Sequence, residues 1–342
     1  MKTLDIHGST GNSTIQIGES LGNLGEYIPP GKAVIITDSN VKKYYMKDFP
    51  PYDIIEIGIG EKIKTLDTVR EIYKKLVDLE ADRSCFIVGI GGGIVCDIAG
   101  FVASTYMRGV RFGFVSSTLL SQVDASVGGK NGVNFSGYKN MIGLFNQPEF
   151  VICDINLLST LPEREILCGM AEVVKHGAIA NADMFLYLED NCEKALVLDN
   201  SMIERLVFDS VVIKSSIVNM DEKEKGERKK LNFGHTFGHA IEKATAVPHG
   251  EALSVGMLFA SRLSVKQGNL PAEDAKRIEK LLEKLKLPTR LNFDKKKVFD
   301  AIKKDKKKRG DSIDFVLLDK IGRAEVKEIP IKELEKAVND IC

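Results

Sequence analysis

The first half of the chain alternates short apolar, β-branched runs with segments of helical hydrophobic spacing. Runs typical of buried strands end at polar or glycine-rich turns and occupy residues 33–38, 54–60, 85–93 and 112–118. Between them, apolar residues in 65–81 recur at three- and four-residue intervals, which predicts an amphipathic helix. Strands that alternate with helices predict a parallel sheet with helices on both faces.

Helical spacing dominates after about residue 156. The pattern predicts helices over residues 162–180, 201–220, 234–244, 250–267 and 271–288. The last of these opens with Pro271, which suits a first helical turn, and closes before Pro288. Two late apolar runs, 313–319 and 324–329, predict a small hairpin. We therefore predict an α/β domain over residues 1–155, a mainly α-helical domain over 156–342, and a cleft between them.

Composition narrows the possible functions. The 342 residues exceed what one ordinary core needs, which agrees with two domains. Lys plus Arg and Asp plus Glu both number 48, so the basic excess of a nucleic-acid binder is missing. The sequence has neither a membrane-spanning apolar run nor the apolar core of a signal peptide at its start. Six scattered cysteines without C-x-x-C favour a reducing cytoplasm over a disulfide framework.

Two stretches in the first half suggest a ligand site. "GIGGGIVCD" (89–97) joins a predicted strand to a predicted helix, where glycines and free backbone N–H groups can accommodate a phosphate. The pattern departs from G-x-G-x-x-G because Ile94 occupies its last position, so a plain tight turn remains an alternative. After the next strand, residues 116–134 contain hydroxyls, Asp124 and Lys130, which could equally form a solvated polar loop. Ligands in open α/β sheets bind at such strand ends.

Three of the five histidines fall within 15 residues of sequence. His235 and His239 are four apart and would share one helical face, so they could clamp one metal or divide two tasks. His249 opens the next predicted helix, where a cap or core role is the ordinary alternative. With Glu172 from an earlier helix, these residues offer nitrogen and carboxylate ligands that suit a catalytic Zn²⁺ site.

Two charged groupings have surface alternatives. Glu172 and Lys175 lie three residues apart on one helical face, as a surface ion pair would. The basic run "KKDKKKRG" (303–310) is either a solvated segment or the source of a lysine that binds an anion. Composition does not decide between these alternatives.

Taken together, six stretches closely resemble the 3-dehydroquinate synthase family. They are "GGGIVCDIAGFVASTYMRGVRF", "STLLSQVDASVGGKNGVN", "KNMIG", "GMAEVVKHG", "DEKEKGERKKLNFGHTFGHAIE" and "HGEALSVGM". The resemblance runs from about Asp38 to about Lys307, and residues 221–242 are its most specific part. The glycine motif alone would also fit glycerol and iron-dependent alcohol dehydrogenases.

The resemblance implies a fold and a reaction. The fold is a Rossmann-like N-terminal domain for NAD and an α-helical C-terminal domain, assembled as a homodimer. The reaction converts 3-deoxy-D-arabino-heptulosonate 7-phosphate to 3-dehydroquinate and phosphate, a step of the shikimate pathway. NAD takes a hydride from C5 and returns it, so no net oxidation occurs. The temporary ketone acidifies C6, phosphate leaves by β-elimination, and ring opening and an internal aldol step follow.

The resemblance also implies roles for individual residues. Zn²⁺ or Co²⁺ would bind Glu172, His235 and His249, which leaves His239 for the substrate's phosphate. The substrate's phosphate, carboxylate and hydroxyls would be met by Lys130, Lys139, Asn140, Lys175, Lys214, Arg228, Asn232 and Lys306. Positions implied for NAD are Asp38, Glu61, Lys64, Gly92, Gly93, Ile94, Asp97, Ser117, Thr118, Leu120, Asp124, Lys130, Lys139, Thr160, Leu161 and Glu165. Arg108 would reach the phosphate site of the neighbouring subunit.

Other functions compete with this one. Other sugar-phosphate cyclases, such as 2-deoxy-scyllo-inosose or 2-epi-5-epi-valiolone synthases, use NAD and a metal but act on substrates without the carboxylate. Retention of Lys214, Arg228, Asn232 and Lys306 favours dehydroquinate synthase. A polyol dehydrogenase would accumulate NADH, and a non-catalytic binding module would not need the clustered ionisable residues. The departures from the family pattern, Asn131, Ser116–Ser117 and Tyr138, remove no charged group.

Overall fold

A computed structural model describes residues 1–303, 308–309 and 311–341. Its internal contacts divide the chain into two compact units. Unit 1 contains Met1–Pro162 and Ile203–Lys223, and unit 2 contains Glu163–Met202 and Glu224–Cys342. The fold class agrees with the prediction, because a parallel α/β sheet is followed by a mainly helical part. Most of the helix predicted over 201–220 belongs to unit 1 and not to the second domain. Its Lys214, for example, forms an ion pair with Asp124 of unit 1.

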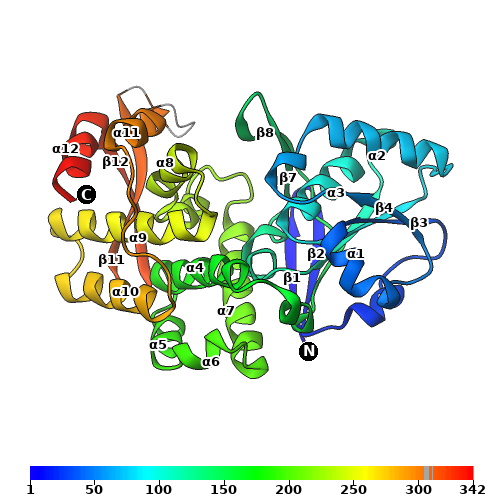
Figure 1. Cartoon of the computed structure of the whole chain (residues 1–342), viewed down its shortest axis with the longest axis horizontal. Coiled ribbons are helices and arrows are strands. Elements are labelled where there is room, and N and C mark those ends of the chain that lie inside the picture. Colours follow the sequence, from blue (N-terminus) through cyan, green and yellow to red (C-terminus); the bar gives the residue numbers. More distant parts are fainter. Residues whose placement is uncertain (304–307, 310, 342) are drawn as a thin grey trace. The chain divides into compact units, whose positions relative to one another are not determined.

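Unit 1 is built on a seven-stranded sheet (Figure 1). Its strands are β1 Lys2–Gly8, β2 Gly11–Ile17, β3 Ala33–Asp38, β4 Asp53–Ile57, β5 Phe86–Gly91, β6 Arg111–Ser116 and β9 Phe150–Cys153. The order is β1-β2-β9-β6-β5-β3-β4, with β1 antiparallel to β2 and the other neighbours parallel. A separate ribbon pairs β7 Lys130–Phe135 with β8 Tyr138–Phe145. The helices are α1 Ser39–Tyr45, α2 Leu66–Asp78, α3 Gly93–Thr105 and α7 Asn200–Met220, joined by short turns at η1 Leu21–Glu26, η2 Met46–Asp48, η3 Glu61–Ile63, η4 Tyr106–Arg108, η5 Ser121–Ala125 and η6 Ile155–Thr160.

The central strands are buried on both faces, which explains their unbroken apolar composition. In β5, Phe86, Val88 and Ile90 join the core on one face of the sheet. On the other face, Gly89 lets α3 approach closely, because a Cβ there would lie 2.9 Å from Cβ of Ala99. Helix α3 begins at Gly93, directly after the glycine-rich turn, and Gly92 is its N-terminal cap residue.

The strand order reverses between β3 and β5, because β4 lies on one side of β3 and β5 on the other. Ligands of open α/β sheets bind at the carboxyl ends of strands beside such a reversal. Asp38 ends β3, and Gly92 and Thr118 follow β5 and β6 closely. The topology of unit 1 therefore gathers several of the positions predicted for NAD at one edge of the sheet.

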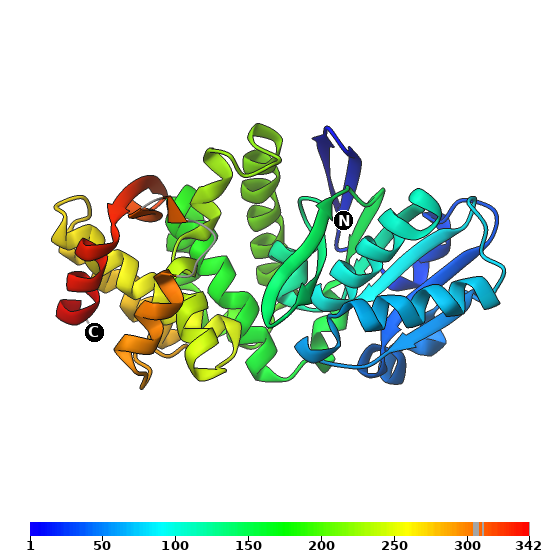
Figure 2. The same cartoon turned by 90° about the horizontal axis from the view of Figure 1, so that it is seen from above.

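Glu222 ties the turn of the β1–β2 hairpin to the segment that follows α7. Its carboxylate accepts hydrogen bonds from the Ser9 backbone N–H at 2.9 Å, the Ser9 hydroxyl at 2.5 Å and the Thr10 hydroxyl at 2.8 Å. Gly8 allows this approach, since a Cβ there would lie 2.4 Å from Glu222 Oε1. The hairpin is the dark-blue pair of strands beside the N-terminus in Figure 2. Glu222 thus anchors both an edge of the sheet and the end of α7.

We expect Glu222→Gln to destabilise the protein at neutral pH by about 2 kcal/mol, because hydrogen bonds to a charged group contribute roughly 1.5–3 kcal/mol. Partial burial alone would raise the pKa of Glu222, but bonds from Ser9, Thr10 and Gln147 lower it to about 2. A depressed pKa stabilises the fold above the unfolded value of about 4.5, and this stabilisation is lost as the pH falls toward 2.

Chemical denaturation of wild type and variant between pH 7 and pH 2.5 measures this difference. The two proteins should converge as the pH falls below about 4.5, whereas Glu26→Gln, at an exposed position, should follow wild type throughout. A gap between Glu222→Gln and wild type that stays constant down to pH 2.5 would contradict the assignment.

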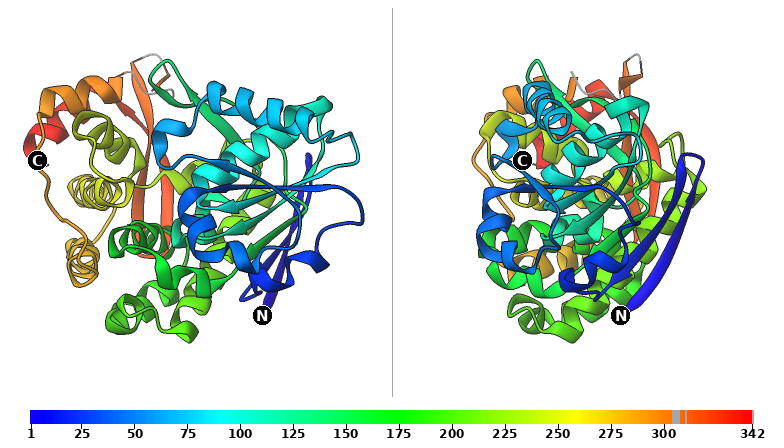
Figure 3. Two further views of the ribbon diagram at one scale, coloured as in Figure 1. Left: turned by 45° about the vertical axis from the view of Figure 1, so that its right-hand side comes forward. Right: turned by 90° about the vertical axis from the view of Figure 1, so that its right-hand side faces the viewer.

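Unit 2 surrounds one central helix. Its helices are α4 Glu163–Ala180, α5 Ala182–Asp190, α6 Cys192–Leu196, α8 His235–Thr245, α9 His249–Lys266, α10 Ala272–Lys284, α11 Lys295–Lys303 and α12 Ile331–Ile341, with a turn at η7 Glu227–Asn232. An antiparallel sheet contains β10 Lys308–Arg309, β11 Ser312–Lys320 and β12 Arg323–Pro330. Helix α9 is buried nearly all round and packs on α4, α8, α10 and β11 (Figures 1 and 3). Such a helix forms the core of its domain.

The predicted helices and the late hairpin are confirmed, with small shifts at their ends. The helix predicted over 271–288 stops at Lys284, because Lys286 adopts a left-handed conformation with φ 58°. Among the described residues, none of the helices has the length and apolarity needed to cross a membrane.

Candidate functional site

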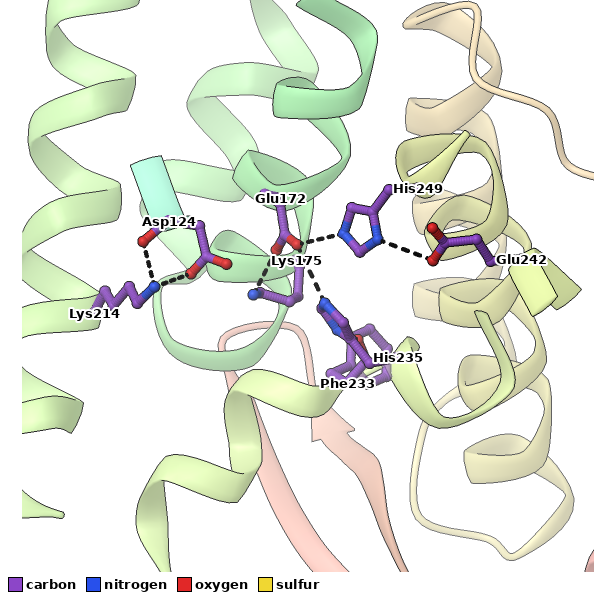
Figure 4. A network of polar contacts seen from close by, with 8 residues as sticks. All are labelled: Asp124, Glu172, Lys175, Lys214, Phe233, His235, Glu242 and His249. Atoms are coloured by element: carbon purple, nitrogen blue, oxygen red, sulfur yellow. Dashed lines mark hydrogen bonds and ion pairs between the residues drawn. The ribbon is translucent and has the colours of Figure 1, made fainter. Parts of the chain in front are cut away.

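Three side chains from three helices of unit 2 converge on one point. Glu172 comes from the middle of α4, and His235 and His249 are the first residues of α8 and α9. Glu172 Oε1 lies 3.2 Å from His235 Nε2 and 3.0 Å from His249 Nε2 (Figure 4). All three potential ligand atoms lie within 4.8 Å of one another. This spacing lets the three groups share a single ion.

Glycines in the same sequence motifs bring these helices together. A Cβ on Gly256 of α9 would lie 2.1 Å from the carbonyl oxygen of Gly234, immediately before α8. A Cβ on Gly250 would lie 2.4 Å from Cα of Cys168 on α4. Larger residues would therefore separate α9 from both neighbours, and the histidines from Glu172. The glycines of "GHTFGHA" and "HGEALSVGM" serve this packing.

Both histidines are held through their second ring nitrogen. His235 Nδ1 lies 3.2 Å from the carbonyl oxygen of Phe233, and His249 Nδ1 lies 3.6 Å from Glu242 Oε2 (Figure 4). Without an ion, each Nε2 meets the Glu172 carboxylate as an N–H donor, and a bound metal would take the place of that proton while Nδ1 keeps its own.

Glu172 is buried with a cation beside it. The side chains of Glu172 and Lys175 are each 1% exposed, and Lys175 Nζ lies 2.5 Å from Glu172 Oε2. The three-residue spacing also allowed an ion pair on the surface, and that interpretation is therefore wrong. Burial by itself would raise the pKa of Glu172, but Lys175 and His235 hold it well below its usual value. The carboxylate stays ionised, as a metal ligand must.

The electrostatic setting of the two histidines differs. Burial lowers the pKa of His235. Burial would also lower the pKa of His249, but its bonds to Glu172 and Glu242 and their charges raise it to about 9. The donor set of two imidazoles and one carboxylate matches catalytic zinc sites with three protein ligands. The residues present therefore fit a divalent metal.

His239 lies beside this cluster but is exposed. Its ring centroid is 5.1 Å from that of His235 and 6.0 Å from that of His249. His239, Glu242 and His249 also form a triple whose ligand atoms lie within 4.8 Å of one another. The triple with Glu172 is the more buried of the two.

Other predicted substrate residues of unit 2 lie around η7. Arg228 is only 2% exposed, and the Asn232 amide donates to Glu224 Oε1 at 2.6 Å. Sequence reasoning missed Glu224, although it lies in the stretch that carries the strongest resemblance. Glu165 lies in the first turn of α4. Lys306 falls outside the residues that the structure describes.

In unit 1, the glycine-rich turn packs against the segment after β6. A Cβ on Gly92 would lie 2.9 Å from Cγ2 of Thr118, and one on Gly93 would lie 2.8 Å from Cβ of Ala125. The Ser117 backbone N–H donates to the Gly91 carbonyl at 2.9 Å. The structure therefore brings Gly92, Gly93, Ser117 and Thr118 together, with Ile94 in the first turn of α3 and Leu120 just before η5.

A second cluster of unit 1 joins four predicted residues. Lys64 contacts Asp97 and donates to Asn140 Oδ1 at 2.6 Å. Burial raises the pKa of Asp97, even though Lys64 opposes the shift. Asn134 links the cluster further, because it donates to Glu61 at 2.7 Å and accepts from the Asn140 backbone N–H at 2.9 Å.

The remaining predicted residues of unit 1 have varied surroundings. Lys214 Nζ lies 2.6 Å from Asp124 Oδ1 (Figure 4). Asp38 caps α1 by accepting from the backbone N–H groups of Asn40 and Val41, so it has a structural role. Thr160 bonds the Tyr45 hydroxyl at 2.8 Å and precedes Leu161, which follows η6. Lys130, Lys139 and Arg108 are exposed.

Two family models match adjacent parts of the chain. They are 3-dehydroquinate synthase N-terminal over residues 54–168 and 3-dehydroquinate synthase C-terminal over residues 169–308. A 3-dehydroquinate synthase of Acetivibrio thermocellus is 45% identical over 298 residues, which covers 84% of this chain and 83% of that protein. One from Dehalococcoides mccartyi strain CBDB1 is 40% identical over 348 residues and covers 97% of both chains.

Solved structures share the whole fold. A 2-deoxy-scyllo-inosose synthase complexed with carbaglucose-6-phosphate, NAD⁺ and Co²⁺ has a TM-score of 0.89 at 28% identity and covers 99% of this chain and 100% of its own. A 2-epi-5-epi-valiolone synthase from Streptomyces hygroscopicus subsp. jinggangensis 5008, with NAD⁺ and Zn²⁺ bound, has a TM-score of 0.88 at 23% identity over 100% and 99% of the two chains. Because the family models span residues 54–308 and the relatives match at 40–45% identity, the chain belongs to the 3-dehydroquinate synthase family.

Proposed function

We propose that this enzyme converts 3-deoxy-D-arabino-heptulosonate 7-phosphate to 3-dehydroquinate and phosphate, as a lyase that depends on NAD and a divalent metal. Family membership supports the reaction. The observation that carries the metal dependence is the buried convergence of Glu172, His235 and His249. The 2-deoxy-scyllo-inosose synthase of the same fold was crystallised with NAD⁺ and Co²⁺, which supports both cofactors.

In this proposal, Glu172, His235 and His249 hold Zn²⁺ or Co²⁺ in unit 2. The ion, when bound, polarises substrate hydroxyls and stabilises alkoxide character. Lys175 adds a buried positive charge 2.5 Å from Glu172 and so keeps the carboxylate ionised. The ring of His239, which the metal does not use, can hold or release a proton near the phosphate group.

NAD binding is assigned to the carboxyl edge of the unit 1 sheet. NAD, when bound, accepts a hydride from the substrate and returns it. Gly92 and Gly93 place backbone N–H groups at the start of α3, where they and the helix dipole suit the pyrophosphate. Asp38, Glu61, Lys64, Asp97, Ser117, Thr118, Leu120, Asp124, Lys139, Thr160, Leu161, Glu165 and Ile94 complete the proposed NAD set.

The substrate carries a phosphate and a carboxylate, so its site needs several cations. Arg228 is held almost fully buried, which fixes its planar guanidinium for a carboxylate or phosphate. Lys214 is 8% exposed and kept in place by Asp124. Lys130, Asn140, Asn232, His239 and Lys306 complete the proposed substrate set.

One assay tests the proposal. Purified protein with NAD⁺, a divalent metal and the heptulosonate phosphate should release phosphate stoichiometrically with 3-dehydroquinate and accumulate no NADH. Stoichiometric NADH without phosphate release would reject the synthase and indicate a dehydrogenase. Omitting NAD⁺ or chelating the metal should each stop phosphate release, which separates enzyme-catalysed elimination from background hydrolysis.

The fold shared with 2-deoxy-scyllo-inosose synthase supports one alternative, a cyclase that acts on a sugar phosphate without a carboxylate. The same assay with a hexose 6-phosphate distinguishes the two. We expect no turnover of the hexose phosphate, because Arg228 and Lys214 would face no carboxylate. Preferential turnover of the hexose phosphate would assign the chain to the alternative activity.

We also propose a homodimer in which Arg108 completes the partner's phosphate site. Arg108 is exposed and lies in a turn where Met107, Arg108 and Gly109 all have positive φ, at 49°, 71° and 116°. For residues other than glycine this conformation costs roughly 1–3 kcal/mol, and such strain is concentrated at functional sites. A strained turn that presents an arginine outward suits a group that acts outside its own subunit.

Mixing two inactive variants, Arg108→Ala and Lys175→Ala, should restore activity under conditions of subunit exchange. At full exchange of an equal mixture, half of the dimers are hybrids. Each hybrid has one intact site, which combines Lys175 of one subunit with Arg108 of the other, and one inactive site. Roughly a quarter of wild-type activity is therefore expected. Native mass spectrometry verifies the exchange. If hybrids form and activity does not return, Arg108 acts within its own subunit.

A further inference from the structure

Helix α8 carries a third ionisable side chain on the face that holds its two histidines. His235, His239 and Glu242 follow one another at intervals of four and three residues, which places them in a line along one side of the helix. The Glu242 side chain is 14% exposed, so it is largely removed from water. The reaction described above does not use it.

Glu242 faces the outer nitrogen of a metal-binding ring. Its Oε2 lies 3.6 Å from His249 Nδ1, while Nε2 of the same ring lies 3.0 Å from Glu172 Oε1 (Figure 4). The His249 ring therefore bridges two carboxylates, one at each nitrogen. His235 shows the same arrangement, because its Nδ1 meets the Phe233 carbonyl and its Nε2 meets Glu172.

We propose that Glu242 is a positioning residue of the metal site, whose carboxylate accepts the Nδ1 proton of His249 and so directs the Nε2 lone pair at the ion. This inference rests on the metal assignment of the proposed function. A carboxylate behind an imidazole fixes the tautomer and the orientation of the ring and makes Nε2 a stronger donor. His235 has only a neutral carbonyl in that place, so His249 is the more basic of the two ligands.

Glu242 does not act as a ligand of the same ion. The two nitrogens of an imidazole point in different directions, and one ion can bind only one of them. Glu172 approaches Nε2 and Glu242 approaches Nδ1, so the two carboxylates cannot join His249 around one ion. The alternative triple of His239, Glu242 and His249 would exclude Glu172 and rely on the exposed His239.

Titration of the metal-free protein with Co²⁺ tests the proposal, with visible absorption and chelator competition as readouts. Glu242→Gln keeps the volume and removes the charge, so Co²⁺ affinity should fall about 10- to 100-fold while the absorption bands keep their shape. Glu279→Gln is the matched control, since Glu279 lies in the same unit, on α10, and pairs with Arg262. It should bind Co²⁺ as wild type does. Thermal unfolding of each metal-free variant verifies that it is folded.

Three outcomes would overturn the proposal. Equal Co²⁺ affinity in wild type, Glu242→Gln and Glu242→Ala would remove any role for Glu242. Glu242 would be a direct ligand if Glu242→Ala lost Co²⁺ binding as completely as His249→Ala and if Glu242→Gln also showed altered absorption bands. Absence of Co²⁺ binding by the wild-type protein would overturn the metal assignment as well, so failure of the inference alone is distinguishable from failure of the proposed function.

Discussion

His235→Ala and His249→Ala will lose their metal on dialysis, whereas His239→Ala will retain it and lose turnover. The first two side chains supply Nε2 atoms 3.2 and 3.0 Å from Glu172 Oε1, so either substitution leaves two ligands of three. His239 is exposed beside the cluster, and its proposed task is to hold or protonate the leaving phosphate. Loss of a general acid or base reduces rates by roughly 100- to 10,000-fold.

Metal analysis after dialysis and phosphate release measured on the same samples separate the two effects. His7→Ala is the control, because His7 is exposed on β1 of unit 1 and should keep both metal and turnover. If His239→Ala proves as empty as His235→Ala, the two histidines of α8 clamp the metal together, and the role of His249 as a ligand must be reassigned from its own variant. The spacing of four residues between His235 and His239 is by itself compatible with such a clamp.

Lys175→Met should strongly destabilise the metal-free protein and be rescued in part by metal. Removing one partner of a buried ion pair leaves an uncompensated charge and costs about 3–5 kcal/mol. For a domain of this size, that corresponds to a fall in melting temperature of roughly 6–20 °C. The side chains of Lys175 and Glu172 are both 1% exposed, so water cannot compensate for the loss. A bound divalent ion supplies the missing positive charge beside Glu172.

Calorimetry with and without Zn²⁺ measures both effects. The double variant Glu172→Gln with Lys175→Met should recover most of the lost stability without metal, because neither charge of the buried ion pair remains. Lys276→Met is a matched control, since Lys276 pairs with Glu273 at the same three-residue spacing but with 65% and 70% exposure. It should change the stability by less than about 1 kcal/mol. A Lys175→Met protein that melts like wild type would contradict the buried pair.

Elements with a strong hydrophobic signal were predictable. The strand at 33–38 and the helices at 162–180 and 250–267 appear at the expected positions, because apolar runs and periodic apolar positions must be buried. The β7–β8 ribbon was not predicted, since most of β8 is exposed and carries no alternating pattern. The short helices α5, α6 and α11 offer too few turns for a clear period.

Membership of α7 in unit 1 depends on contacts between distant residues. The sequence pattern identifies the helix but contains no signal for its partner. Lys214 of α7 pairs with Asp124, and Glu222 just beyond α7 holds the hairpin turn at Ser9. These partners lie far away along the chain, so only the folded structure reveals them.

The sequence by itself determined which residue types could bind a metal, and that His235 and His239 share a helical face. Spacing along one helix is a local property, and it allows either histidine to act as a ligand. Only the tertiary structure decided that His235 meets Glu172 and His249, because the crossing of α8, α9 and α4 sets which face is buried. That crossing depends on close contacts at Gly250 and Gly256, where any side chain would force the helices apart. The role of Glu242 behind His249 likewise required the packed helices, since its partner is on another element.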